Sequence, residues 1–291
     1  NNNIKKREKL STFWAIPEFM SKKLDNEGLR SIINDYDLLY IDLWGVVHNG
    51  IKLHENAIKT LLEIEKINKE YVLLTNAPRP NKVVRSFLDK MGMKENLSKK
   101  VYTSGEAALN YIKKKHLKDK FFHIGPTRDI DLFAEFKKNK IDIIEDCDYL
   151  LCSGLFEKHE HDLNYYKYIL EKNLSKKMIC TNPDLIVDRG NVRELCAGSV
   201  AMVFEKMGGK VIYFGKPYPE VYNQSAQKKN KKILCIGDNL NTDIKGANLQ
   251  NHHSMLISHG VHKKEIEENG LEKVSKKYET IVNFTQSELK W

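Results

Sequence analysis

Short apolar runs alternate with amphipathic segments along most of this chain. The runs are continuous in apolar character and most end in Gly, Asp, Thr or Asn; they cover residues 38–44, 71–76, 121–125, 149–154, 178–182, 211–216, 233–238 and 254–258. Runs of this kind fit strands of a sheet that is buried on both faces. Helical periodicity marks the segments between them, at residues 54–66, 82–91, 104–115, 162–172, 199–207, 242–250 and 263–269. This order predicts an α/β fold with parallel sheets and helices on both faces, and residues 271–291 are expected to add a last strand and helix.

Length and charge narrow the class of protein. A chain of 291 residues suggests two domains, or one large α/β domain with an insertion. The net charge is +9, but only seven of the 48 basic residues are Arg, and the Lys residues are scattered among Asp and Glu. Nucleic-acid-binding proteins more often gather Arg and Lys on one face, together with aromatic residues for stacking. We therefore expect a Lys-rich solvated surface and no nucleic-acid partner.

Cysteine usage and hydropathy indicate the compartment. The five Cys residues form no CxxC pair, and most of them lie within apolar runs, which favours buried free thiols in a reducing compartment. No apolar run approaches the length of about 18 residues that a membrane span needs. The first ten residues lack the apolar centre of a secretory signal. These features predict a cytoplasmic protein without a membrane partner.

Polar residues follow two of the predicted strands in the first half of the chain. Asp42 lies at the end of the first apolar run, where burial is costly unless the carboxylate is paired or bound to a metal, and Gly45 lets the backbone turn close to a ligand. Thr75 and Asn76 end the second run just before a helix, where backbone N–H groups favour an anion. Taken singly, each has an ordinary explanation as a turn or helix-capping residue.

Two later runs end in a similar way. Lys216 follows one of them, and Asp238 and Asp243 bracket the loop after the next, where they offer the hard oxygen ligands that Mg²⁺ prefers. A strand-end Lys is usually exposed, and either Asp alone could cap a turn. Together with Asp42 and Thr75, however, the set contains a carboxylate nucleophile, a phosphate-binding hydroxyl, a cation and a metal site. Phosphoryl transfer requires these parts, because its catalysis depends mostly on positioning and on charge neutralisation.

The segments TNAPRP, YTSGEA, NPDLIV, GKPYPEVY and GDNLNTDIKGA give the chain a family resemblance between residues 36 and 262. It resembles the haloacid dehalogenase-like (HAD) superfamily, and within it the subclass IIA branch of NagD-like and 4-nitrophenylphosphatase-like enzymes, in a subgroup with a DxWGV first motif. The resemblance implies a Rossmann-like parallel-sheet core at residues 1–101 and 201–291. An inserted α/β cap of the C2 type is implied at residues 102–200.

Roles for individual residues follow from this resemblance. Asp42 would be the nucleophile that forms an aspartyl-phosphate, Thr75 would bind the phosphoryl oxygens, and Lys216 would steady both. Mg²⁺ would be held by Asp42, the main-chain carbonyl of Trp44 and Asp238, with Asp243 in or behind the coordination shell. The residues expected near the substrate are Gly45, His48, Asn76, Asn182, Asp184 and Asn239.

Trp44 is a departure from the family pattern. Phosphatases of the family carry at this position a second Asp that protonates the leaving group, whereas indole is only a hydrogen-bond donor. General acid–base catalysis contributes ~10²–10⁴-fold, so this loss matters; if another group takes the role, His48 and the cap residue Asp184 are candidates. His48 could also be an ordinary loop histidine, exposed or satisfied by backbone. Arg79, beside Thr75 and Asn76, could reach a substrate anion or form a surface ion pair.

Three functions remain open at this stage. The main prediction is a Mg²⁺-dependent phosphatase of a small phosphorylated metabolite, either with a substitute acid or with a substrate that has a good leaving group. A second is a catalytically impaired regulatory protein that keeps the Mg²⁺ and phosphate site. Dehalogenases also have an aromatic residue at the position of Trp44 but lack an acidic loop like that of Asp238 and Asp243, which makes dehalogenation the weakest alternative. The family resemblance also implies a homodimer formed through the cap.

Overall fold

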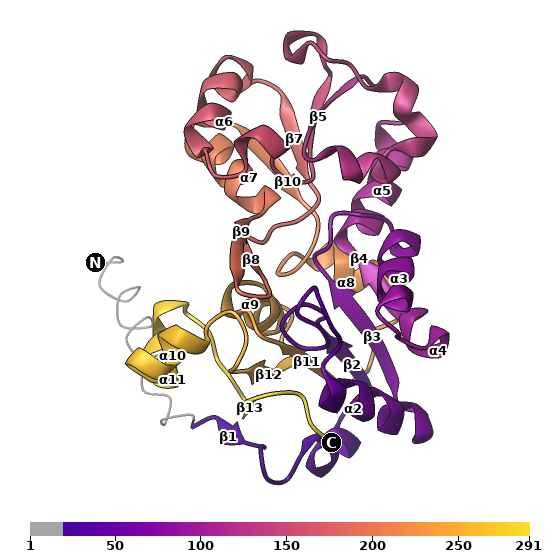
Figure 1. Cartoon of the computed structure of the whole chain (residues 1–291), viewed down its shortest axis with the longest axis vertical. Helices are drawn as coiled ribbons and strands as arrows, with labels where there is room; N and C mark the ends of the chain where they lie inside the picture. Colours follow the sequence, from indigo (N-terminus) through magenta and orange to yellow (C-terminus); the bar gives the residue numbers. More distant parts are fainter. Residues whose placement is uncertain (1–19) are drawn as a thin grey trace, which may run out of the picture.

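Seven parallel strands form the largest of three sheets in the computed structural model, which describes residues 20–291 (Figure 1). The order across the sheet is β1-β13-β12-β11-β2-β3-β4. The strands are β1 (Lys22–Lys23), β2 (Leu38–Ile41), β3 (Glu70–Thr75), β4 (Val101–Thr103), β11 (Ile233–Gly237), β12 (His253–Ile257) and β13 (Phe284–Gln286). Residues 1–19, which the predicted core includes, lie outside the described residues.

Helices cover both faces of this core sheet, as the continuous apolar runs predict. Along β2, Leu39 and Ile41 belong to a cluster with residues of α2 and α3, whereas Leu38 and Tyr40 belong to another with residues of α8 and α9. The helices of the core are α2 (Glu55–Lys66), α3 (Asn81–Lys90), α4 (Glu95–Ser98), α8 (Pro219–Ser225), α9 (Lys245–Leu249), α10 (Lys263–Asn269) and α11 (Leu271–Lys277). The expected last helix and strand in residues 271–291 are α11 and β13.

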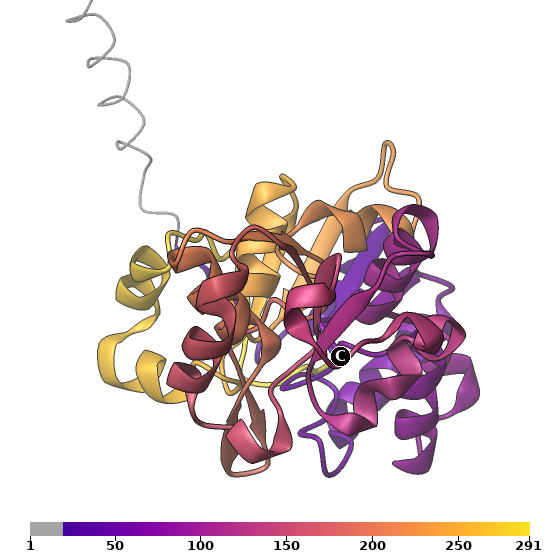
Figure 2. The ribbon, with the colours of Figure 1, turned by 90° about the horizontal axis from the view of Figure 1, so that it is seen from above.

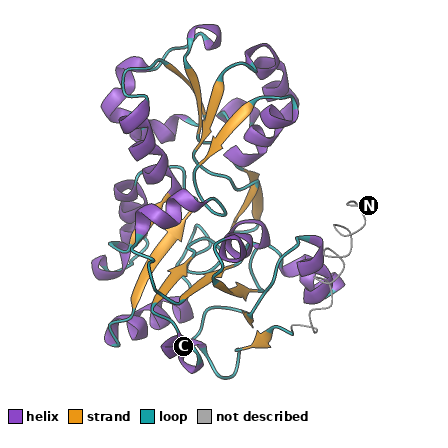
Figure 3. Cartoon of the chain, turned by 180° about the vertical axis from the view of Figure 1, so that it is seen from behind, coloured by secondary structure: helices purple, strands orange, loops and turns teal. Residues whose placement is uncertain are grey.

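A second parallel sheet, with the order β10-β7-β6-β5, forms the cap (Figures 1 and 3). Its strands are β5 (Phe121–Ile124), β6 (Tyr149–Cys152), β7 (Lys177–Cys180) and β10 (Lys210–Tyr213), and its main helices are α5 (Ser104–Lys115), α6 (Leu163–Leu170) and α7 (Ala197–Lys206). One face of this sheet packs with α5 and the other with α6 and α7. The view from above shows these two helical layers apart, α5 in magenta and α6 and α7 in red to brown (Figure 2).

The strand pairing moves both predicted boundaries of the cap, the first by two residues and the second by the rest of helix α7 and one strand. Strand β4 pairs with β3 of the core through Thr103, so the cap begins at 104 rather than 102. Strand β10 pairs in parallel with β7, so the cap ends near 213 rather than 200. The strand before Lys216 was expected in the core sheet, but it belongs to the cap sheet, because its apolar residues complete the faces that α5 and α7 cover.

A small antiparallel hairpin, β8 (Ile186–Arg189) and β9 (Val192–Leu195), lies between the cap and the core (Figure 1). It was not predicted, because each of its strands has two apolar and two charged residues, with neither the strict alternation nor the continuous apolar run that indicates a strand. All five Cys residues are free and buried, as the apolar context of most of them predicted. None of the helices in the described part of the chain is long and apolar enough to cross a membrane.

Candidate active site

A cavity of about 400 Å³ lies where the cap faces the core. The core contributes Asp42 directly after β2, Thr75 at the end of β3 and Asp238 directly after β11. From the cap side, Asp184 and Arg189 line the same space. A volume of this size accommodates a small organic molecule. The cavity therefore joins the carboxyl ends of the core strands to polar groups of the cap, which is where open α/β sheets bind ligands.

Lys216 connects three elements at the bottom of the cavity. Its ammonium group donates hydrogen bonds of 2.7 Å to Oδ1 of Asp42, to Oδ1 of Asp243 and to the carbonyl of Leu74. The residue is 4% exposed. All three donors of the ammonium group are thus satisfied, and two carboxylates from distant parts of the chain are held together by one cation.

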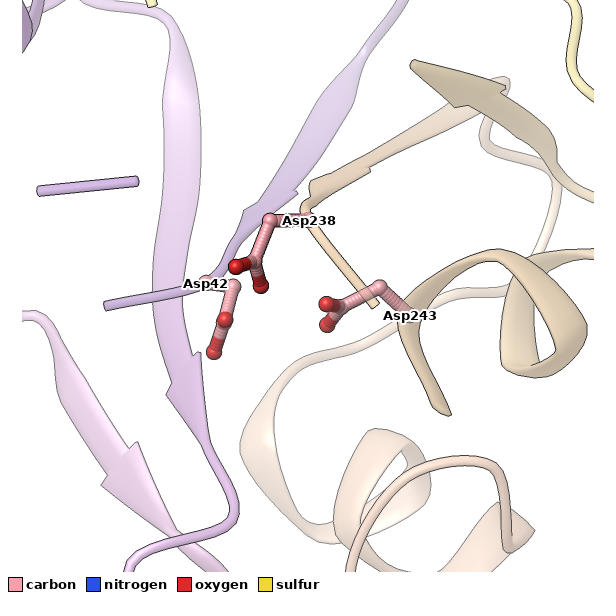
Figure 4. Close-up of side chains that lie close together, drawn as sticks. All are labelled: Asp42, Asp238 and Asp243. Carbon is pink, nitrogen blue, oxygen red and sulfur yellow. The ribbon is translucent and has the colours of Figure 1, made fainter. Parts of the chain in front are cut away.

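Asp42, Asp238 and Asp243 form a buried carboxylate cluster (Figure 4). One carboxylate oxygen from each lies within 4.8 Å of the others. When all three are ionised, Lys216 neutralises one of the three negative charges and leaves two. Hard oxygen ligands around an uncompensated double charge are the donor set that a divalent cation such as Mg²⁺ takes. The residues therefore fit the metal that the resemblance implies.

The ionisation of these groups reflects their crowding. Burial raises the pKa of Asp42 to about 7, with Asp243 acting in the same direction and Lys216 opposing both. Burial and the charge of Asp42 likewise hold the pKa of Asp238 well above its ordinary value. Burial lowers the pKa of Lys216, but Asp243 and Asp42 outweigh it and leave that pKa above its ordinary value. A cation bound among the carboxylates would favour their ionised forms.

Backbone geometry brings the acidic loop close to the loop after β2. Gly45 has φ +77°, and a Cβ atom at this position would lie 2.0 Å from Oδ2 of Asp238, so only glycine fits here. The N–H of Val261 donates to Oδ2 of Asp238 at 2.8 Å, and the N–H of Asn239 donates to Oδ2 of Asp243 at 3.1 Å. Gly45 and Asn239, both predicted near the substrate, line the cavity.

Asn76 ties the core to the cap. Its side-chain oxygen accepts from the N–H of Lys216 at 2.7 Å, while its amide nitrogen donates to the carbonyl of Lys216 at 2.9 Å and to Oδ1 of Asp184 at 3.0 Å. Asn182 accepts from the N–H of Asp184 at 3.0 Å, and burial raises the pKa of Asp184 to about 6. All three residues line the cavity, and Asn76 and Asn182 also hold neighbouring residues in place.

Trp44 and His48 lie on different sides of the loop after β2. Trp44 lines the cavity, whereas His48 is 1% exposed and is not among the lining residues. The ring of His48 packs edge-on against Trp44 and Phe87, and its Nδ1 accepts from the N–H of Gly50 at 2.9 Å. The structure therefore places His48 behind Trp44, satisfied by backbone, and does not bring it to the substrate side.

The burial of His48 predicts a pH-dependent stability. Burial, with smaller effects of His54 and Arg189, lowers the pKa of His48 from 6.5 to about 3, so the folded state holds the ring neutral. The neutral ring contributes its full stabilisation of the folded state above the pKa of His48 in the unfolded chain. This contribution is lost as pH falls below that pKa, because the unfolded chain then binds a proton that the folded state does not. We expect His48 to cost about 1.4 kcal/mol of unfolding free energy between about pH 7.5 and about pH 5.5. Urea denaturation at both pH values should show a smaller decline for His48→Gln than for wild type.

His161→Gln, which changes an exposed histidine, is the control for this experiment and should decline as wild type does. An equal decline in His48→Gln and wild type would contradict the neutral, buried state of His48.

Several cavity residues of the cap were not singled out from the sequence. The hydroxyl of Ser153 donates to Oδ2 of Asp129 at 2.7 Å and is hydrogen-bonded to Nε2 of His123 at 2.7 Å. Arg79, from the core, lies with its Nε 3.9 Å from Oδ1 of Asp129, which makes it a bridge to the cap rather than a surface ion pair. Arg189 belongs to the hairpin. Arg79 was a candidate from the sequence, but no sequence signal pointed to Ser153, Asp129 or Arg189, because their proximity depends on how the cap sits on the core.

Comparison with known proteins gives two family matches and many similar structures. Residues 39–138 match the family described as haloacid dehalogenase-like hydrolase, and residues 213–282 match one described as HAD-hydrolase-like. A hydrolase of the haloacid dehalogenase-like family from Brucella suis 1330 is 30% identical, with a TM-score of 0.73 over 81% of this chain and 90% of that one. No curated protein sequence matches the chain.

Two further structures share the fold at lower identity. A 4-nitrophenylphosphatase from Thermotoga maritima is 22% identical, with a TM-score of 0.67 over 89% of this chain and 96% of that one. A glycerol phosphate phosphatase from Mycobacterium tuberculosis, solved in complex with magnesium, is 24% identical, with a TM-score of 0.59 over 79% of this chain and 70% of that one.

Proposed function

The chain belongs to the haloacid dehalogenase-like hydrolases, and we propose that within this family it is a Mg²⁺-dependent phosphatase of a small phosphorylated metabolite. The observation that carries the proposal is the buried cluster in which Lys216 joins Asp42 and Asp243 beside Asp238, at the bottom of a cavity that Thr75 also lines. The two phosphatases of similar fold, one for 4-nitrophenyl phosphate and one for glycerol phosphate, support a phosphate monoester as the substrate class.

The reaction would proceed in two displacements at phosphorus. Lys216 holds Oδ1 of Asp42, which leaves the other carboxylate oxygen to attack the phosphorus atom. A new oxygen–phosphorus bond forms, the bond to the leaving group breaks, and the phosphoryl group is carried on Asp42. The hydroxyl of Thr75, which accepts from the N–H of Ala77 at 3.2 Å, would donate to a phosphoryl oxygen. Water then attacks phosphorus, which releases inorganic phosphate and restores the carboxylate.

Asp42, Asp238 and Asp243, with the main-chain carbonyl of Trp44, would hold the Mg²⁺ ion. The ion supplies charge that offsets both the carboxylates and the phosphoryl group during transfer. Lys216 orients the nucleophile, since its ammonium group binds Asp42 and Asp243 at once.

A regulatory protein that binds Mg²⁺ and phosphate without turnover is the second candidate, and Trp44 is the observation that favours it. The indole offers no proton to a leaving group, and His48 lies away from the cavity. Dehalogenation is less well supported, because the three buried carboxylates form a site for a cation that this chemistry does not need.

Metal removal tests the proposal. We expect wild type to release phosphate from 4-nitrophenyl phosphate in Mg²⁺, to stop in excess EDTA and to recover when Mg²⁺ is added back. Asp238→Asn should need about 10-fold or more Mg²⁺ for half-maximal rate, since it removes one charged ligand. Asp142→Asn, at an exposed carboxylate far from the cluster, should leave the Mg²⁺ requirement unchanged. If wild type releases no phosphate from any ester in Mg²⁺, the binding-protein alternative gains.

A further inference from the structure

Arg189 lies over the residue that stands in place of the family's acid. The carbon at the centre of its guanidinium group is 5.0 Å from the ring centre of Trp44, and both residues line the cavity that contains Asp42. We propose that Arg189 stabilises the leaving-group oxygen in place of the missing acid, so that the substrate's leaving group departs as a guanidinium-bound alkoxide. This inference rests on the proposed phosphatase function.

The position of Arg189 is fixed from three sides. Its Nε donates to Oε1 of Glu194 on the paired strand at 3.2 Å. The N–H of Gly190, the next residue, donates to the carbonyl of Asn49 in the core at 3.1 Å, which anchors the hairpin turn to the loop after β2. Stacking of guanidinium on indole adds a cation–π attraction. The cap thus presents this cation to the cavity from an anchored turn.

Gly50 allows Trp44 to act as the platform. A Cβ atom at position 50 would lie 2.3 Å from Cη2 of Trp44, so the indole packs directly on the backbone of the loop. The same Cβ would lie 3.4 Å from Cγ of Arg189. The indole of Trp44, the backbone at Gly50 and the aliphatic part of Arg189 therefore pack together. This packing explains why a large aromatic residue can occupy the position two residues after Asp42.

The guanidinium group of Arg189 keeps N–H donors that are available to a ligand. Among residues 20–291, hydrogen bonds from Arg189 to other side chains are limited to its Nε, so the two terminal nitrogens keep four N–H donors for a ligand. Its side chain is half-buried, as is that of Glu194. Arg189 therefore offers fixed N–H donors and a positive charge at the edge of the cavity.

The chemical step balances without a protein acid. As Asp42 bonds to phosphorus, the electron pair of the breaking bond moves to the leaving-group oxygen. Arg189 donates hydrogen bonds to this oxygen and keeps its own proton, and the oxygen then takes a proton from water. Preorganised donors aimed at developing charge are among the strongest catalytic effects. The benefit is largest for alkyl esters, whose oxygen carries more charge, and small for 4-nitrophenyl phosphate.

Asp184 is the alternative source of help, and it differs from Arg189 in what it would do. It lines the cavity, but Oδ1 accepts a hydrogen bond from Asn76, which occupies one of its carboxylate oxygens. As an acid it would transfer a proton, whereas Arg189 would only bind charge. Substitution of each residue separates the two roles.

The test compares kcat/KM for glycerol phosphate and 4-nitrophenyl phosphate in Mg²⁺. For Arg189→Ala we expect a loss of about 10² -fold on the alkyl ester and less than about 3-fold on the aryl ester. Arg189→Lys should recover part of the loss, because it keeps the charge but not the planar fork. Trp44→Leu, which removes the platform, should cause the same selective loss. Arg128→Ala, which removes a charge at the rim of the cavity, is the matched control and should affect both esters equally or not at all.

Three outcomes would overturn the inference. Equal losses on both esters in Arg189→Ala, or no loss, would exclude a role at the leaving group. A selective loss found only in Asp184→Asn would assign that role to Asp184. If wild type releases no phosphate from these two esters or from any other phosphate ester, the proposed phosphatase function fails, and this inference fails with it. If wild type is active and Arg189→Ala shows no selective loss, the inference about Arg189 alone fails.

Discussion

Asp42→Asn is expected to slow phosphate release by at least about 10³-fold while leaving the protein folded. An amide of the same shape keeps the packing after β2 but is a far weaker nucleophile than a carboxylate. The variant should be as stable as wild type or more so, because it removes one of three buried charges while Lys216 keeps Asp243 as its partner. Phosphate release and urea denaturation, measured on both proteins, check the two parts.

Detection of the phosphorylated intermediate tests the role of Asp42 directly. Mass spectrometry of rapidly quenched wild type should find a phosphoryl group on the peptide that contains Asp42, and Asp42→Asn should not carry it. Asp142→Asn, at a surface carboxylate, should behave as wild type in both rate and labelling. Residual turnover in Asp42→Asn near the wild-type rate, or labelling elsewhere, would contradict the role of Asp42 as nucleophile.

Lys216→Met should be the most destabilising single change at the site. It leaves Asp42 and Asp243 buried without their shared cation, and breaking a buried pair in this way typically costs about 3–5 kcal/mol. Mg²⁺ should restore more stability to the variant than to wild type, because the ion would supply positive charge that Lys216 no longer provides to the carboxylates. Activity should also fall by about 10²-fold or more, since the orientation of the nucleophile is lost.

Urea denaturation with and without Mg²⁺ measures both effects of Lys216→Met. Lys206→Met, at an exposed lysine in the last turn of α7, controls for the loss of a surface charge and should change stability little. Unfolding of Lys216→Met at the wild-type urea concentration in the absence of Mg²⁺ would show that the lysine does not compensate the carboxylates.

Much of the fold could be predicted because buried strands leave a strong apolar signal. The continuous runs predicted the strands of the core and cap sheets except the short β1, β4 and β13, and β13 was expected only as a last strand within residues 271–291. The hairpin was not predicted because β8 and β9 pair only with each other and are not buried. Their residue pattern therefore contains polar positions that face solvent as well as apolar positions that pack. The helix α8 was not predicted, because its two buried residues, Val221 and Tyr222, are adjacent and show no helical period.

The candidate site was predictable for a different reason. Carboxyl ends of parallel strands meet at one edge, so Asp42, Thr75 and Asp238 had to lie near one another once the strands were assigned. Lys216 joined them although its strand belongs to the other sheet. The placement of His48 behind Trp44 could not be foreseen, because one turn of a loop decides which side chain faces the cavity. The homodimer through the cap stays a prediction.

The route by which Lys216 reaches the carboxylates restricts modular engineering of this protein. The lysine lies three residues after β10, the last strand of the cap, and its backbone is held by Asn76 of the core. A cap taken from a relative would replace the strand that delivers this lysine, even if the graft kept every residue of the core sheet. To exchange the cap, the second crossover point must therefore be placed so that Lys216 keeps its position. Otherwise the last strand of the donor cap must match β10 in length and register. An exchange of the cap would therefore change the substrate range and the catalytic activity of the protein together.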